Sequence, residues 1–311
     1  MLELSYNLSL TLKDRLEKID ILRKDILLSP ISPKTELQMR WDAMINRAYN
    51  SLALANSPLT KQETVKILTS SKAKFSREEE DALLYKKALD HISQKWLVPG
   101  KNVTVKDVLI LYDIFCRGRL IIPPSRIQEL LDYIQAHEQH PVIQAGVASL
   151  GITRIQPFSD GNGRLSRLLP YLFLYKNGFD VRGLIEFEKS WSQDKETYLQ
   201  ALKIGLEAAS ITLWLEYFSN SLLKELTLIF GKIKTHTPEN LGIHSSFWDL
   251  SDRQKAILNI VENPGTSITN RKVQKQFNVS QITASRDLSK LANLRLLFSH
   301  GKGRSVYYTK V

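Results

Sequence analysis

The residues of this chain best suited to chemistry are concentrated in residues 156–167, which read Gln-Pro-Phe-Ser-Asp-Gly-Asn-Gly-Arg-Leu-Ser-Arg. Two glycines flank Asn162 in a turn that follows the carboxylate of Asp160 and opens an apolar run with helical spacing. Such a turn points free backbone N–H groups at an anion. Arg164 and Arg167 lie one helical turn apart on the same face of the expected helix. The stretch therefore predicts a phosphate-binding loop.

The stretch resembles the signature of Fic proteins, His-Pro-Phe-x-(Asp/Glu)-Gly-Asn-Gly-Arg-x-x-Arg. It matches that signature everywhere except at Gln156, which takes the place of the family's catalytic histidine. The similarity covers roughly residues 35 to 220, since His140 before the loop and Tyr198 after it fall where the family has comparable features. The resemblance implies a mainly α fold, a Fic-type helical bundle, in a family that typically transfers AMP from ATP to a hydroxyl of a target protein.

The resemblance also implies a role for each residue of the loop. The backbone of residues 161–163 would hold the α- and β-phosphates of ATP, and Asp160 would ligate Mg²⁺ through oxygen. Asn162 would hydrogen-bond the α-phosphate, the two arginines would bind the outer phosphates, and a tyrosine would line the adenine pocket. The nucleotide-binding residues implied in this way are Gly161, Asn162, Gly163, Arg164, Arg167 and Tyr198.

Gln156 cannot perform the proton transfer that the family assigns to its histidine. An amide is not basic near neutral pH and offers only a carbonyl acceptor and an NH₂ donor. General-base catalysis contributes roughly a hundred- to ten-thousand-fold in rate, so nucleotide binding is expected to survive while transfer falls to a trace. No substitute base is evident, because Asp160 is expected to bind the metal ion. His137 and His140 are expected to be exposed or to cap a helix.

A second departure lies upstream, where autoinhibited family members carry a helix with the pattern (Ser/Thr)-x-x-x-Glu-(Gly/Asn). The glutamate of that helix pairs with the second arginine of the loop. Here Ser51 and Asn56 match the pattern, but Ala55 stands at the glutamate position. Arg167 would therefore lack its intramolecular carboxylate, which predicts an open anion site.

A third departure is the short segment 117–122, where family members usually have a hairpin that binds the target protein as an added strand. Three consistent losses favour a protein that has diverged naturally and no longer transfers AMP. Engineered substitutions at 55 and 156 would explain two of the losses but not the short segment. The alternative function is an active protein adenylyltransferase, unrestrained because Ala55 replaces the inhibitory acid.

Composition indicates an ordinary globular protein of two or three domains, with 311 residues, 43% of them hydrophobic and 24% charged. The single cysteine, Cys116, excludes an internal disulfide. The first 25 residues show no signal-peptide pattern, and no apolar run reaches the ~18 residues of a membrane span. The sequence therefore predicts a cytoplasmic protein with no membrane partner.

Helical periodicity dominates residues 10 to 230, and strand signals are nearly absent there. The predicted helices are 10–28, 35–55, 61–72, 77–97, 104–116, 125–138, 141–154, 162–177 and 194–231. The predicted organisation is an N-terminal helical segment (1–34), a Fic-like domain with the inhibitory-helix-like element (35–232), a linker (233–249) and a C-terminal domain (250–311).

The C-terminal domain carries most of the excess positive charge. Residues 251–311 contain eleven Lys or Arg against three acids, a net charge of +8 out of +11 for the whole chain. Helices predicted at 251–263, 268–277 and 279–293, followed by two strand-like runs around residues 301–304, resemble a winged helix-turn-helix domain of α+β type.

Double-stranded DNA is the partner that this domain implies, and a winged helix used only for protein contacts is the alternative. A second copy of the chain and a target protein are left open as further partners. The predicted DNA-binding residues are Gln281, Thr283, Ser285 and Arg286 on the recognition helix and Lys302 and Arg304 on the wing.

Overall fold

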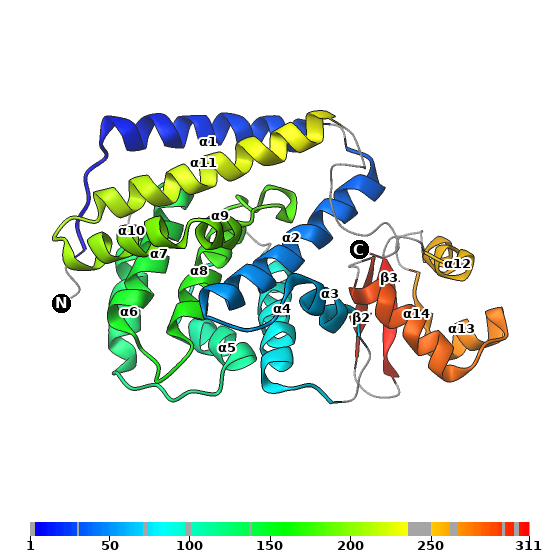
Figure 1. Cartoon of the computed structure of the whole chain (residues 1–311). Helices are drawn as coiled ribbons and strands as arrows, with labels where there is room; N and C mark the ends of the chain where they lie inside the picture. The colour runs from blue at the N-terminus through cyan, green and yellow to red at the C-terminus, as the bar shows by residue number, and fades with distance from the viewer. Residues whose placement is uncertain are drawn as a thin grey trace.

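Helices build almost all of the chain up to residue 235 (Figure 1). The computed structural model describes residues 4–29, 31–70, 74–96, 101–136, 139–235, 250–261, 266–293, 296–301 and 305–310. Every helix predicted up to residue 177 is present, with each end within three residues of its predicted position. The helices of this part are α1 (Leu10–Leu28), α2 (Pro33–Leu54), α3 (Lys61–Thr69), α4 (Arg77–Lys95), α5 (Val105–Phe115), α6 (Pro124–Gln135), α7 (Pro141–Ile155), α8 (Asn162–Lys176), the 3-10 helix η1 (Val181–Gly183), α9 (Phe187–Gln193), α10 (Lys195–Glu207) and α11 (Thr212–Thr235).

The centre of the core is the pair α7 and α8, whose residues are almost all buried. Gly146 allows α11 to approach α7 closely, because a Cβ at this position would lie 2.8 Å from the Leu215 side chain. Trp214 on α11 donates to the Gly146 carbonyl at 2.8 Å. Helix α1 packs along α11, as Figure 1 shows, and belongs to the same hydrophobic core. None of the described helices combines the length and the apolar character needed to cross a membrane.

The predicted helix 194–231 is wrong as a single element, because the chain leaves the helix between α10 and α11. The sequence there contains no glycine or proline, so the break comes from tertiary contacts. The guanidinium of Arg154 donates to the carbonyls of Gly205, Leu206 and Ala208, which stabilises the end of α10. The Ile211 N–H then donates to the Ser5 carbonyl at 2.8 Å, outside any helix.

The start of α4 is fixed by a capping box. The Ser76 hydroxyl accepts from the Glu79 N–H at 3.3 Å, and the Glu79 carboxylate accepts from the Ser76 N–H at 2.9 Å. The acidic first turn suits the positive end of the helix dipole, as the sequence predicts. The box fixes the position of Asp81, one turn further along the helix.

The C-terminal part contains a three-stranded antiparallel sheet beside three helices. Strand order is β1-β3-β2, and Tyr308 of β3 pairs with Ile268 on one side and Ser299 on the other. Residues 268 and 269 form a strand, not the start of a helix, because they pair with β3. The elements are α12 (Asp252–Ile260), β1 (Ile268–Thr269), α13 (Asn270–Phe277), α14 (Gln281–Asn293), β2 (Leu297–His300) and β3 (Tyr307–Lys310).

A separate hydrophobic core holds this part together, with Ile257, Val273 and Leu288 at its centre. Helix α14 contacts α3, and β2 lies across a cleft of about 500 Å³ from α4 and η1. The cleft is lined by Lys86 and Gly183 on one side and by Phe298 on the other. Helix α11 continues to Thr235, so the first residues of the predicted linker are helical, and 236–249 lie outside the described residues.

Three carboxylates form a cluster with nearby lysines. They are Asp42 on α2, Glu186 in the turn before α9, and Glu225 on α11. Burial raises the pKa of Asp42 to about 7, partly offset by Lys61 and reinforced by Glu186. Burial and the Glu186 carboxylate likewise raise the pKa of Glu225 to about 7. Glu186 accepts from the Asn46 amide at 2.8 Å. The cluster therefore contains acids that are protonated more readily in the folded chain than in the unfolded one.

Glu225→Gln is expected to stabilise the protein at pH 8 and to change its stability little at pH 5. Between the ordinary pKa of 4.5 in the unfolded chain and the folded pKa of about 7, the folded state binds the additional proton. Stability from this group is therefore present at acid pH and lost as the pH rises through about 7. The gain at pH 8 is on the order of 3 kcal/mol at most. Thermal unfolding at both pH values measures it, with the exposed Glu196→Gln as control. Equal effects of Glu225→Gln at both pH values would contradict the prediction.

Candidate functional site

The loop between α7 and α8 holds the residues predicted to do chemistry. Helix α7 ends at Ile155, and Gln156 turns the chain in the left-handed region, with φ 41° and ψ 63°. Its N–H still donates to the Ile152 carbonyl at 2.9 Å, while its side chain is exposed. Gln156 is thereby exposed at the end of α7, at the position where the family resemblance places a base.

Hydrogen bonds within the loop hold its conformation. The Asn162 amide oxygen accepts from the Phe158 N–H at 3.0 Å, and its NH₂ donates to the Phe158 carbonyl at 2.6 Å. The Phe158 ring stacks on Tyr112 at 3.5 Å between centroids, and the Tyr112 hydroxyl donates to the Asp160 carbonyl at 2.9 Å. Asn162 therefore has a structural role that the sequence did not predict, and only one of its two amide N–H groups remains for a phosphate.

Gly161 is required by both conformation and space. Its φ is +74°, and a Cβ at this position would lie 2.8 Å from the Cys116 sulfur. The first α-helical bond of α8 joins the Leu165 N–H to the Gly161 carbonyl, so the N–H groups of Asn162 and Gly163 precede the helix ladder. Together with the helix dipole, these groups form an anion-binding turn of the predicted kind.

Asp160 lies beside this turn with 64% of its side chain exposed. One carboxylate oxygen accepts from the Gly161 N–H at 2.6 Å, and the other lies 3.8 Å from the Arg164 guanidinium. Among the described residues no group of three acidic, histidine or cysteine side chains could hold a metal ion. One accessible carboxylate fits Mg²⁺ that takes its other ligands from phosphates and water, which is how this ion is usually bound.

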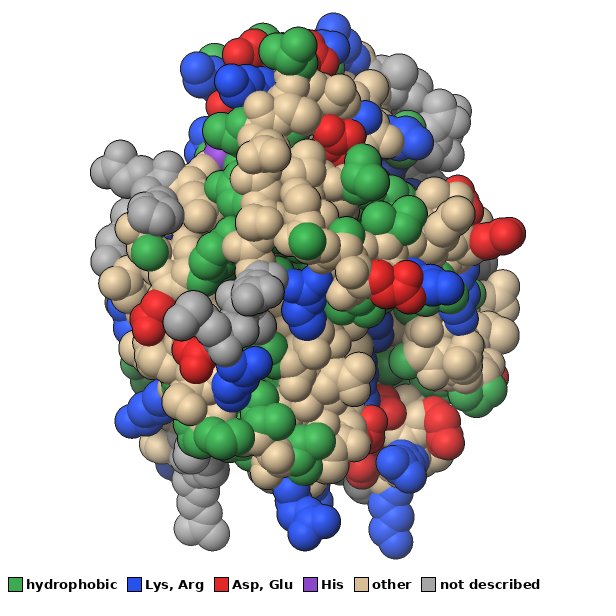
Figure 2. All heavy atoms as spheres, turned by 90° about the vertical axis from the view of Figure 1, so that its left-hand side faces the viewer, with side chains coloured by type: hydrophobic (Ala, Val, Ile, Leu, Met, Phe, Trp, Pro, Cys, Tyr) green, Lys and Arg blue, Asp and Glu red, His purple; other side chains and the backbone are tan. Residues whose placement is uncertain are grey.

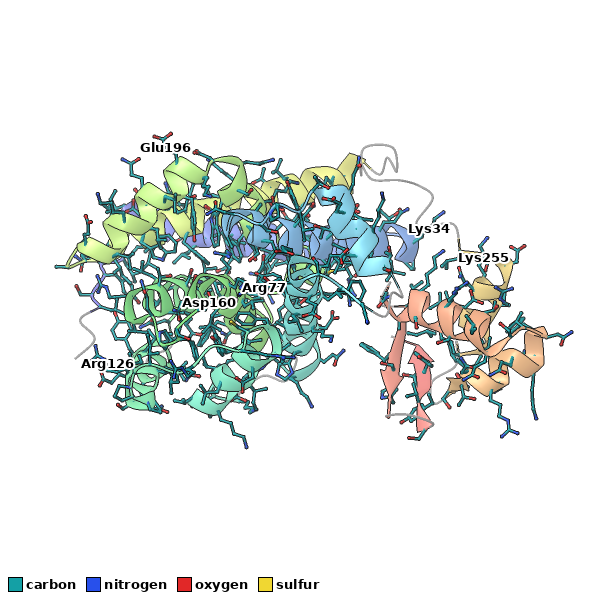
Figure 3. The ribbon with its side chains drawn as sticks, turned by 60° about the horizontal axis from the view of Figure 1, so that its bottom comes forward. Lys34, Arg77, Arg126, Asp160, Glu196 and Lys255 are labelled. Carbon is teal, nitrogen blue, oxygen red and sulfur yellow. The ribbon has the colours of Figure 1, made fainter. Side chains whose placement is uncertain are left out.

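The two loop arginines have intramolecular partners on different helices. The Arg164 guanidinium donates to Asp81 of α4 at 2.7 Å and lies 3.7 Å from the Cys116 sulfur. In Figure 3 the labelled Asp160 and Arg77 mark the neighbouring starts of α8 and α4. The acidic run that begins α4 therefore reaches the loop, which the sequence reasoning missed.

Arg167 is buried, with 5% of the residue exposed, and is bound by Ser51 of α2. Its Nε donates to the Ser51 hydroxyl at 2.8 Å and its Nη2 to the Ser51 carbonyl at 2.9 Å. The open anion site stays a prediction, in which a phosphate would share Arg167 with Ser51. Arg167 lacks an acid at Ala55, but neutral oxygens of Ser51 already occupy part of its guanidinium.

Tyr198 lies behind Arg167 in the core, not on an open pocket wall. It is 4% exposed, its ring stacks on Trp191 at 5.0 Å, and burial raises the pKa of its hydroxyl while Arg167 lowers it. The structure therefore gives Tyr198 a supporting position behind the arginine.

A chain of buried polar groups continues inward from Ser51. Tyr85 contacts Ser51 and donates to one oxygen of the fully buried Glu188 at 2.7 Å, while Tyr171 donates to the other. Burial raises the pKa of Glu188, although both hydroxyls stabilise its charged form. The Arg47 guanidinium stacks over Tyr171 at 4.5 Å and donates to the Gly183 carbonyl at 2.8 Å. This buried polar chain links the loop to the cleft beside β2.

The predicted recognition helix α14 begins as expected. The Ser280 hydroxyl accepts from the Thr283 N–H at 3.1 Å, which caps the helix. Gln281, Ser285 and Arg286 are exposed, whereas Thr283 is partly buried and bonds to Ser280. The predicted wing residues Lys302 and Arg304 lie outside the described residues.

Helix α13 adds a basic surface that the sequence reasoning did not single out. Arg271, Lys272 and Lys275 are exposed and line a shallow groove with Thr269. On the face at the left of Figure 1, by contrast, acidic and basic side chains are interspersed (Figure 2). The groove along α13 is therefore a basic surface suited to phosphates.

Comparison with known proteins identifies both parts. Residues 118–174 match the Fic/DOC family, and residues 253–309 match the DeoR-like helix-turn-helix domain. The chain contains a Fic domain followed by a DeoR-like helix-turn-helix domain. The mainly helical prediction with a C-terminal α+β domain is thereby confirmed.

Curated relatives of the Fic domain include protein adenylyltransferases. The protein adenylyltransferase Fic of Culex quinquefasciatus is 27% identical over 194 residues, which cover 53% of this chain and 38% of that protein. The protein of the same name from Aedes aegypti is 25% identical over 221 residues, covering 61% and 43%. The chain thus spans about two fifths of the length of these relatives.

Solved Fic structures share the fold at low sequence identity. A Fic family protein from Desulfovibrio desulfuricans G20 covers 98% of this chain and 97% of its own, with a TM-score of 0.63 and 16% identity. A Fic domain containing signaling protein from Bacteroides thetaiotaomicron VPI-5482 covers 73% and 99%, with a TM-score of 0.55 and 22% identity. At these identities the likeness shows the fold alone.

The segment that resembles the inhibitory-helix pattern is the end of α2. The helix stops at Leu54, Ala55 follows as its C-cap, and Asn56 adopts a left-handed φ of 61°. The Lys195 ammonium donates to the Asn56 amide oxygen at 2.8 Å, which ties this end to α10. Ser51 lies one turn before Ala55, so positions 51 and 55 share a helix face toward Arg167.

The short segment 117–122 of the Fic domain pairs with the loop itself. The Ile121 N–H donates to the Pro157 carbonyl at 2.8 Å, and the Ser159 N–H donates to the Arg119 carbonyl at 2.9 Å. Leu120 forms an antiparallel bridge with Phe158, so only its own backbone groups point away from the loop. Such an edge provides little backbone for strand addition, and weak docking of a target by this route stays a prediction.

His140 lies too far from the loop to act as a base there. Its ring nitrogen accepts from the Val142 N–H at 3.2 Å, so it caps the start of α7, and burial lowers its pKa. Helix α7 has 15 residues, which places the cap about 22 Å from the loop. His137 lies outside the described residues.

Proposed function

We propose that this protein is a DNA-binding regulator whose Fic domain binds ATP with Mg²⁺ and transfers little or no AMP. One observation carries the proposal. The phosphate loop is held by its own hydrogen bonds, yet the exposed residue at its start is the non-basic Gln156. A site of this kind retains groups that bind phosphate and lacks the group that would take a proton from an attacking hydroxyl.

Nucleotide binding is supported by the donors around the turn. The N–H groups of Asn162 and Gly163 precede the helix ladder at the start of α8 and can donate to an anion, and Arg167 adds a buried guanidinium. Mg²⁺, held by Asp160, would neutralise phosphate charge and orient the phosphates. The protein's own contribution is to position these groups before the ligand arrives, since Asn162 and Tyr112 already fix the loop.

DNA binding is supported by the topology and charge of residues 250–311. The capped helix α14 exposes polar side chains at its start, and α13 adds three exposed basic residues beside it. In helix-turn-helix proteins the start of the recognition helix contacts base edges, while flanking basic residues contact phosphates. The proposed division into a Fic domain, a linker and a DNA-binding domain follows from these separate roles.

Arg286→Ala is expected to reduce sequence discrimination, whereas Lys275→Ala is expected to weaken binding to every duplex by a similar factor. An arginine on the recognition helix reads base edges, and its loss costs roughly 1–3 kcal/mol of discrimination. A lysine that contacts a phosphate adds about one to the magnitude of the slope of log affinity for DNA against log salt concentration. Fluorescence anisotropy of the whole chain measures both, using a duplex selected from a random pool and scrambled duplexes. Absence of any binding at about 50 mM salt would favour the protein-contact alternative.

The alternative function is an active protein adenylyltransferase, which the names of the curated relatives favour. Binding and transfer separate the two functions in one experiment on the whole chain. Calorimetry with Mg²⁺ and ATP is expected to show binding, and incubation with labelled ATP is expected to leave the chain and added proteins unlabelled. Efficient labelling would overturn the proposal, and absence of binding would overturn the nucleotide site.

A further inference from the structure

We infer that Asp81 competes with the outer phosphates of a nucleotide for Arg164, and so provides from α4 an inhibitory acid that Ala55 cannot provide from α2. The inference rests on the proposed nucleotide site. It concerns the arginine that the inhibitory acid of the family pattern does not contact.

The geometry around Arg164 shows how fully its guanidinium is engaged. Nη1 lies 2.7 Å from an Asp81 oxygen, and Nη2 lies 3.8 Å from Asp160 and 3.7 Å from the Cys116 sulfur. The guanidinium carbon also lies 5.6 Å from the centre of the Phe115 ring. Only 12% of the Arg164 side chain is exposed. An incoming phosphate must therefore share or replace the Asp81 contact to form a two-pronged bond with this arginine.

The contact is specific to one acid of the run that begins α4. Glu79 is used in the capping box, and Glu80 is exposed with no side-chain bond among the described contacts. Any acid of the first turn would interact favourably with the helix dipole, so the dipole does not explain why the Asp81 side chain contacts Arg164. Asp81 is 33% exposed and Arg164 12%, which makes the pair stronger than a fully exposed one.

The charges of the loop give the competition a direction. Arg164 and Arg167 are opposed by Asp81 and Asp160, so these four side chains carry no net positive charge. Among the described residues Arg167 is hydrogen-bonded by neutral oxygens, including those of Ser51, whereas Arg164 already has a carboxylate. Repulsion by Asp81 grows with the negative charge placed near Arg164. Asp81 therefore weakens the binding of ATP more than that of ADP, and the binding of ADP more than that of AMP.

The test compares Asp81→Asn with Glu80→Gln, which removes the same formal charge from the adjacent residue of α4 without touching Arg164. Calorimetry on the whole chain with Mg²⁺ measures the affinities for ATP, ADP, AMP and inorganic tripolyphosphate. Asp81→Asn is expected to raise the affinity for ATP and for tripolyphosphate about tenfold. The affinity for ADP should rise less, and the affinity for AMP should rise by less than about twofold. Glu80→Gln is expected to change each affinity by less than about twofold.

Equal affinities in Asp81→Asn and Glu80→Gln would overturn the inference. So would an AMP gain as large as the ATP gain, because it would indicate a general charge effect. A lower melting temperature of Asp81→Asn with unchanged affinities would show that Asp81 only ties α4 to α8. Tighter tripolyphosphate binding by Asp81→Asn in a protein that binds no nucleotide would support Asp81 as the competitor and overturn the proposed nucleotide site.

Discussion

Gln156→His is expected to raise AMP transfer by about a hundred- to ten-thousand-fold, from a trace to a readily measured rate. The loop presents position 156 in a left-handed conformation that histidine tolerates better than most residues. An imidazole there has an unperturbed pKa near 6.5 and can take the proton of an attacking hydroxyl. Incorporation of labelled AMP into the chain itself is the readout, since segment 117–122 provides little edge for a foreign target.

Two further variants control this experiment. Gln156→Asn keeps an amide and should leave transfer at its original level. Gln156→His combined with Ala55→Glu should lose the gain, because a carboxylate one turn after Ser51 would compete with the phosphate for Arg167. If Gln156→His leaves transfer undetectable while ATP still binds, the divergence has gone beyond the base. If the unmodified protein already transfers AMP as fast as Gln156→His, the interpretation of Gln156 is wrong.

Arg167→Ala is expected to weaken binding of ATP with Mg²⁺ by about ten- to a hundredfold. The substitution removes a charged two-pronged donor, and hydrogen bonds of this kind contribute roughly 1.5–3 kcal/mol. Calorimetry measures the affinity. The ATP affinity of Arg167→Lys should lie between those of the unmodified protein and Arg167→Ala, because lysine keeps the charge but lacks the paired guanidinium donors. Arg167 is buried, so thermal unfolding of each variant must confirm that it remains folded. Equal ATP affinity in folded Arg167→Ala and unmodified protein would contradict the assignment.

The fold was largely predictable because its helices follow local rules. The apolar periodicity predicted α1 to α8 within three residues at each end. The break after Glu207 was not predictable, because it depends on Arg154 and on the Ser5 carbonyl, which are distant in the sequence. The strand at 268–269 was missed because two residues show no periodicity and form a strand only by pairing with β3.

The candidate site was predictable as a list of residues but not as a set of contacts. The motif identified the loop, yet the Ser51 contact with Arg167 and the Asp81 contact with Arg164 join residues 116 and 83 positions apart. No local pattern indicates which acid of a charged run reaches an arginine. Asn162 was expected to face the phosphate, whereas the loop uses most of its bonding capacity on Phe158.

The buried polar chain from Arg167 through Glu188 and Arg47 to Gly183 ends at the cleft that β2 borders. Whatever free energy this chain transmits between nucleotide and DNA must obey thermodynamic reciprocity. If ATP changes the affinity for DNA by some factor, DNA changes the affinity for ATP by the same factor. Bound DNA would then change the affinity of the phosphate loop for ATP, and the occupancy of each site would depend on the concentration of the other ligand.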